Sequence, residues 1–226
     1  MIDNGGESGQ ARSVQGHVLT VVLGAALSAL GCVVMSRVVD SFVDRRSISW
    51  LAPFAAAVVA GVLVTRAPDP LVAVALCVFA SALVSLCEID IRVRRLPREI
   101  SYSAFAISTP LLVASALAND DPRRAAMVLA GSVIFGLVML GLYAASRGAM
   151  GDGDVRVAPL LGAFLGYWSP ALVLVALFVA SFSAAVVGVG VMALRRTGRA
   201  TTVAFGPFLA VGTVVAIVLG SSPQWS

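Results

Sequence analysis

Two carboxylates alternate with two glycines in the stretch Gly151-Asp152-Gly153-Asp154, which separates two hydrophobic runs. An ionisable residue at the membrane end of an apolar helix indicates a functional site by default. Glycine is a poor helix residue unless the backbone must turn or approach another group closely. We therefore predict a functional role for Asp154, and we interpret Asp152 as a helix-end charge paired with a nearby arginine.

Another carboxylate, Asp90, ends an apolar run in "LVSLCEIDIRVRRLPRE". Two carboxylates that share one proton can act together as base and acid, which is the chemistry of a hydrolase that uses neither metal nor covalent nucleophile. Like charges in close proximity keep one member protonated, and burial acts in the same direction. Such a pair titrates as a unit, so the sequence assigns neither role to one aspartate. Glu88, two residues earlier, is interpreted as a paired helix-end charge.

The composition places these acids in a membrane protein. The 226 residues are 59% hydrophobic and 12% charged, whereas about 25% of a soluble domain is charged. We predict an all-α polytopic protein with about eight transmembrane helices, a disordered polar tail over 1–16 and one membrane-embedded domain over 17–222. The apolar segments run over 18–38, 50–65, 70–89, 100–118, 124–146, 155–167, 170–194 and 202–220.

The arginines predict the orientation. With both termini outside, twelve of the sixteen basic residues lie on the cytoplasmic side, as the positive-inside rule requires. This orientation places Asp90 and Asp154 on the same face of the membrane, where the two loops can meet. The arginines at 92, 94, 95 and 98 are therefore interpreted as orientation signals.

The sixth segment, 155–167, is short for a membrane helix. Thirteen residues give about 20 Å of helix against a hydrocarbon core of roughly 30 Å. We therefore expect Asp154 to be recessed within the protein, with a turn at the glycines before it. Phe205-Gly206-Pro207 is expected to kink the last segment, and Gly162 and Gly166 form a GxxxG pattern that indicates helix packing.

Other kinds of site are not indicated. Cys32, Cys77 and Cys87 lie in apolar runs without a CxxC pair, so they are interpreted as small buried hydrophobes. His17 is the single histidine and is interpreted as an interfacial residue. We predict no metal and no cofactor. The basic balance is explained by orientation, so no nucleic-acid partner is expected.

Two motifs carry a resemblance to a known family. Asp90 is followed after five residues by Leu96-Pro97 and then by Ile100-Ser101. This pattern resembles the first active-site motif of the prepilin peptidases, the type IV leader peptidase family. The second stretch, Gly151 to Arg156, is similar to that family's Gly-x-Gly-Asp motif, and "FGPFLAVG" at 205–212 is similar to a further family segment. The resemblance covers about 70–215, with the core motifs in 87–215.

The resemblance implies a membrane aspartic endopeptidase with Asp90 and Asp154 as its catalytic pair. Its substrate would be a type IV pilin-like precursor of a pilus or secretion system, cut at the cytoplasmic face of a bacterial inner membrane. The partners expected are this precursor and the lipid bilayer. The loop between the first two segments lacks the two CxxC pairs of long members, so N-methyltransferase activity is not expected. The motif-supporting residues are Gly151, Gly153, Leu96, Pro97, Arg156, Phe205, Gly206 and Pro207.

Three alternatives remain open. The acids could serve a proton- or cation-coupled transporter, although no inverted repeat or mid-helix charge is visible. The chain could be an inactive assembly partner of a pilus or secretion machine. A presenilin-like protease would carry a Tyr-Asp motif, whereas Ile89 precedes Asp90 here.

Overall fold

A computed structural model describes residues 22–34, 51–93, 98–146, 150–195 and 205–220. Every regular element in these ranges is an α-helix, so the prediction of an all-α fold is confirmed. The tail over 1–16 and His17 lie outside the described residues, so the two predictions made for them are not tested.

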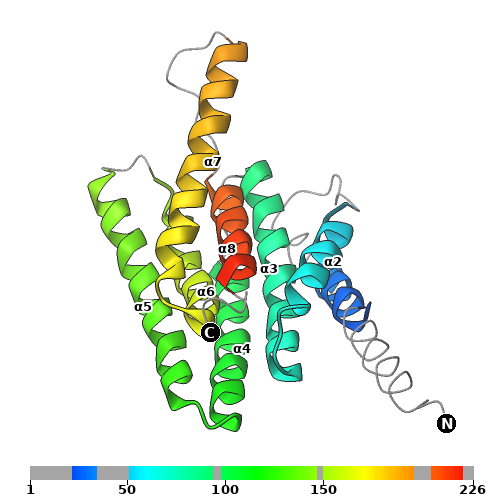
Figure 1. The fold of residues 1–226 in the computed structure, drawn as a ribbon. Coiled ribbons are helices and arrows are strands. Elements are labelled where there is room, and N and C mark those ends of the chain that lie inside the picture. The colour runs from blue at the N-terminus through cyan, green and yellow to red at the C-terminus, as the bar shows by residue number, and fades with distance from the viewer. Residues whose placement is uncertain (1–21, 35–50, 94–97, 147–149, 196–204, 221–226) are drawn as a thin grey trace, which may run out of the picture.

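The helices form a bundle in which neighbours in sequence are mostly neighbours in space (Figure 1). Helix α8 lies beside α3 on one side and beside α7 on the other. The helices, in chain order, are an N-terminal helix described over Val22–Val34, α2 (Leu51–Val64), α3 (Pro70–Val93), α4 (Arg98–Ala118), α5 (Pro122–Ala145), α6 (Asp152–Trp168), α7 (Leu172–Arg195) and α8 (Gly206–Gly220).

An Asp-Pro pair begins each of two long helices. The Asp69 side chain accepts a hydrogen bond from the backbone N–H of Val72, and Pro70 opens α3. Asp121 likewise accepts from the N–H of Arg124 before Pro122 opens α5. An aspartate cap satisfies a free backbone donor, and proline at the first position loses no helical hydrogen bond. The sequence therefore specifies both starts locally.

Two segment ends and one predicted kink differ from the sequence analysis in ways that matter for the acids. Helix α3 continues to Val93, so Asp90 lies inside a helix rather than in the loop after it. Helix α6 begins at Asp152, so the chain turns at Gly151, and both aspartates are already helical. The predicted kink at Phe205-Gly206-Pro207 is instead a helix start, because α8 begins at Gly206 with Pro207 in its first turn, where proline is tolerated.

Helix α6 is the core of the bundle, and most of its 17 residues are buried. Its 17 residues make about 26 Å of helix at ~1.5 Å per residue, which is shorter than the hydrocarbon core of roughly 30 Å. Gly162 and Gly166 lie directly on α5, as the GxxxG pattern predicted. Gly131 of α5 faces them, and this third glycine was not singled out in the sequence.

The N-terminal helix packs on α3 through small polar side chains. Ser28 and Ser81 lie 3.1 Å apart between their hydroxyl oxygens, and Ser81 also donates to the backbone oxygen of Ser28. The Cys77 thiol donates to the Gly24 oxygen, and Cys32 is buried on the same helix contact. For Cys32 and Cys77 the interpretation as small buried residues is confirmed.

Four of the described helices are long and apolar enough to cross a membrane. They correspond to α3, α4, α5 and α7, and three shorter apolar helices accompany them. Large apolar side chains such as Phe54, Phe178 and Phe182 are exposed on the outside of the bundle, as lipid-facing residues are. The chain is thus a polytopic helical membrane protein, while eight spans and outside termini stay predictions.

The α5–α6 contact is expected to tolerate no side chain at its glycines. A Cβ at Gly162 would lie 2.3 Å from the backbone oxygen of Gly131, so Gly162→Ala must push the helices apart. Thermal unfolding in detergent should show that the substitution lowers the free energy of unfolding by about 1–3 kcal/mol, the usual range for overpacking. Gly141→Ala on α5 is the matched control, because a Cβ there meets nothing within 4 Å. An equal Tm for both variants would contradict the close contact.

Candidate active site

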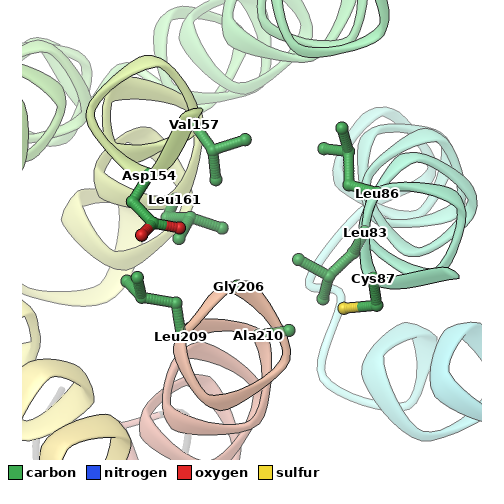
Figure 2. A pocket seen from close by; sticks show the side chains of 9 residues that line it. All are labelled: Leu83, Leu86, Cys87, Asp154, Val157, Leu161, Gly206, Leu209 and Ala210. Carbon is green, nitrogen blue, oxygen red and sulfur yellow. The ribbon is translucent and has the colours of Figure 1, made fainter. Parts of the chain in front are cut away.

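Three helix ends meet around one small cavity. They are the C-terminal part of α3, the first turn of α6 and the first turn of α8 (Figure 2). The cavity has room for about one water molecule. Its lining is apolar apart from one carboxylate and consists of Leu83, Leu86, Cys87, Asp154, Val157, Leu161, Gly206, Leu209 and Ala210.

Asp90 lies in the last turn of α3 and is only 6% exposed. Its Oδ2 accepts a hydrogen bond from the backbone N–H of Gly206, at 3.1 Å. This bond joins residues 116 positions apart, so the start of α8 lies directly against the end of α3. A buried carboxylate requires such a donor, because burial without one strongly disfavours the charge.

Asp154 lies in the first turn of α6 and is also 6% exposed. Figure 2 shows its carboxylate turned toward α8, on the side of α6 that carries Leu161. Gly206 lines the cavity together with Asp154 and donates to Asp90. The structure therefore brings the two predicted aspartates together. Gly206, the first residue of α8, binds Asp90 and lines the same cavity as Asp154.

Burial is the main influence on Asp154. It raises the pKa of Asp154 to about 7, with smaller contributions from the carboxylates of Asp90 and then Asp152. Asp154 lies outside the four helices that are long enough to span the membrane. A carboxyl group with this pKa is partly protonated near neutral pH, as one member of a proton-sharing pair must be.

Asp152 has a different environment from Asp154. It is exposed, and its Oδ2 accepts from Nη2 of Arg156 one turn later on α6. The interpretation of Asp152 as a paired helix-end charge is confirmed. Gly151 precedes the helix in an extended conformation, and Gly153 is buried within the first turn.

The other predicted site residues lie near the end of α3, at the start of α8 or outside the described residues. Glu88 and Phe205 are half-buried, and Pro207 lies in the first turn of α8. Leu96 and Pro97 lie outside the described residues, so the structure says nothing about that half of the first motif. Among the described residues, no group of three or more His, Cys, Asp or Glu side chains could hold a metal ion.

The cavity wall contains residues that the sequence did not single out. Cys87 was interpreted only as a small hydrophobe, yet it is half-buried and lines the cavity opposite Asp154 (Figure 2). Leu83, Leu86 and Cys87 occupy one face of α3, with the three- and four-residue spacing of helical neighbours. That spacing was the available signal, but it does not distinguish a cavity wall from ordinary core.

The fold and the site define a polytopic helical membrane protein with a buried pair of aspartates at its helix ends. Residues 77–189, half of the chain, match the type IV leader peptidase family. The chain belongs to this family, which confirms the resemblance seen in its motifs. The match contains Asp90 and Asp154, whereas Gly206 lies beyond it.

Two curated relatives are prepilin leader peptidase/N-methyltransferases. The protein of Pectobacterium carotovorum subsp. carotovorum is 32% identical over 145 residues, which is 63% of this chain and 50% of the relative. That of Aeromonas hydrophila is 30% identical over 150 residues, which is 62% and 47%. The chain thus spans about half the length of these relatives. No solved structure matches it.

Replacing Asp154 by asparagine is expected to stabilise the protein more at high pH than at low pH. The folded protein retains the Asp154 proton up to about pH 7, whereas the unfolded chain releases it near the ordinary pKa of about 4. Ionisation of Asp154 therefore destabilises the fold increasingly as pH rises through this window, and has no effect below it. Thermal unfolding in detergent at several pH values should show Asp154→Asn gaining a few degrees in Tm above pH 7 and nothing near pH 4.

Asp152→Asn is the matched control, because Asp152 is exposed on the same helix turn. Its Tm difference from the wild type should not show this rise with pH. A Tm gain for Asp154→Asn that is the same at all pH values would contradict the raised pKa.

Proposed function

We propose that this protein is a membrane aspartic endopeptidase that removes the leader from type IV prepilin-like precursors. The observation that carries the proposal is the meeting of Asp90 and Asp154, each 6% exposed, around the start of α8. Membership of the type IV leader peptidase family supports the same reaction. The names of the curated relatives support the substrate class.

The chemistry requires only the two carboxyl groups and a water molecule. One carboxylate takes a proton from the water while the water oxygen bonds to the carbonyl carbon of the scissile peptide. The other, protonated, carboxyl gives its proton to the carbonyl oxygen, which forms a neutral gem-diol. The C–N bond then breaks as the carbonyl reforms: the carboxyl that took the water proton gives it to the leaving nitrogen, and the ionised carboxylate takes a hydroxyl proton from the gem-diol, which restores the starting pair. The cavity beside Asp154 has room for about one such water.

The side chains around the Asp154 carboxylate are apolar, which suits a substrate segment that is itself apolar. Leu161 of α6 and Leu209 of α8 line the cavity beside the Asp154 carboxylate. Arg98, near the expected cytoplasmic surface, is exposed at the start of α4. We infer that the peptide bond is cut near the cytoplasmic surface of a bacterial inner membrane, with both termini of the enzyme outside.

The proposal is limited to peptide cleavage. The relatives carry both activities in their names, and this chain spans about half of their length. The segment between the first two apolar runs contains no cysteine, so the cysteine-rich module expected for methyl transfer is not in that position.

Either single aspartate substitution is expected to abolish cleavage. Wild type, Asp90→Asn and Asp154→Asn would each be co-expressed with a pilin-like precursor, and the precursor's mass would be followed. Loss of an acid–base group typically lowers the rate by about 10²–10⁴-fold, and loss of one member of a proton-sharing pair should leave no processed precursor in this assay.

Asp152→Asn is the control, since the exposed Asp152 carboxylate pairs with Arg156. This variant should process the precursor at nearly the wild-type rate. Retained cleavage by Asp90→Asn or Asp154→Asn, in a protein that is correctly inserted, would refute the catalytic pair. Absence of cleavage by the wild type with every precursor tried would instead favour the transporter or the assembly partner.

A further inference from the structure

The start of α8 is arranged around a carboxylate. The backbone N–H of Gly206 donates to Oδ2 of Asp90 at 3.1 Å. The first N–H groups of a helix have no partner within the helix, so this donor is free to bind a side chain. The backbone oxygen of Phe205 accepts from the N–H groups of Phe208 and Leu209, at 3.0 and 3.1 Å. These two bonds fix the first turn of α8 and so orient the Gly206 N–H toward Asp90.

A Cβ at this position would overlap the Asp90 carboxylate. A Cβ on residue 206 would lie 2.6 Å from Oδ2 of Asp90 and 3.3 Å from its Cγ. Real Cβ atoms do not approach an oxygen so closely, so any larger residue must displace the Asp90 carboxylate. The backbone of residue 206 does not itself demand glycine, because its φ lies outside the left-handed region. The absence of a side chain therefore serves the contact with Asp90.

The same contact distinguishes the two aspartates electrostatically. A backbone N–H that donates to a carboxylate stabilises its ionised form, and a helix N-terminus adds to this effect. Asp154, by contrast, faces a cavity whose other walls are apolar, with Val157 and Leu161 on its own helix. Apolar surroundings favour the neutral carboxyl group.

We propose that Gly206 is a positioning residue: through the hydrogen bond from its backbone N–H, it holds the Asp90 carboxylate in place as the ionised member of the pair. This assignment rests on the proposed peptidase function. It adds which member of the pair is ionised and names a residue of α8, outside the matched family region, on which the position of Asp90 depends.

The kinetic test compares Gly206→Ala with Gly188→Ala, using the full-length detergent-purified protein and a synthetic precursor peptide. A Cβ at Gly188 of α7 meets nothing within 4 Å, so this control should behave as the wild type. Gly206→Ala should lower kcat by about 10–100-fold, as a displacement of about 1 Å in a catalytic group does. Its KM should change by less than about twofold, because the apolar side chains that line the cavity, such as Leu161 and Leu209, are unchanged.

A stability cycle tests the contact without any substrate. Gly206→Ala should lower Tm in the wild-type background, where the Cβ overlaps the Asp90 carboxylate. In an Asp90→Ala background the overlap is gone, and the same substitution should have no destabilising effect. This dependence on Asp90 separates positioning of the carboxylate from a general role of Gly206 in folding.

The outcomes are distinct. A lowered kcat with unchanged KM, together with a Tm loss that disappears in Asp90→Ala, supports the assignment. Wild-type kcat in Gly206→Ala overturns it while leaving the peptidase function intact. An equal Tm loss in both backgrounds also overturns it, because the Cβ would then act on something other than Asp90. If the wild type cleaves no precursor, the peptidase proposal fails, and the stability cycle still decides whether Gly206 positions Asp90.

Discussion

The structure depends on keeping two carboxylates close together and away from water. A buried charge without a hydrogen-bond partner is strongly unfavourable, and two like charges make it worse. In the described bundle, two features reduce this cost. Asp90 receives the backbone N–H of Gly206, and Asp154 has its pKa raised so that it retains a proton to higher pH. Both features require α3, α6 and α8 to converge, and buried apolar side chains of these helices, such as Leu86, Leu161 and Leu209, hold them together.

Contacts along α6 fix its position in the bundle and so fix where its first turn lies. In its second half, Gly162 and Gly166 approach the backbone of α5 so closely that neither helix can slide or rotate freely. At the end opposite the acids, the Tyr167 hydroxyl lies 3.1 Å from that of Ser115 on α4, which in turn donates to Asp69. Asp69 caps α3. One chain of contacts thus fixes α6 against α5, α4 and α3, and its first turn carries Asp154 to a defined place.

Residue type and spacing predicted the all-α fold class and that Asp90 and Asp154 lie on one face, because apolar runs and membrane-end acids are local signals. Asp152 was correctly separated from Asp154, since Arg156 lies one helical turn away and the pair is visible in the sequence. The failures concern long-range information. No local pattern reveals that Gly131 faces the GxxxG glycines, that Cys87 borders the cavity, or that the Gly206 N–H reaches Asp90. Each of these depends on how separate helices pack.

The helix termini alone would assign the charges the other way. Asp90 lies near the C-terminal end of α3, where the macrodipole disfavours an anion, and Asp154 lies at the N-terminal end of α6, where it favours one. Each effect is only about 0.3–1 kcal/mol near a surface. A direct hydrogen bond to a charged group contributes about 1.5–3 kcal/mol, and burial has raised the pKa of Asp154 despite its helix. The stronger local contacts therefore outweigh the dipoles, and the charge belongs on Asp90.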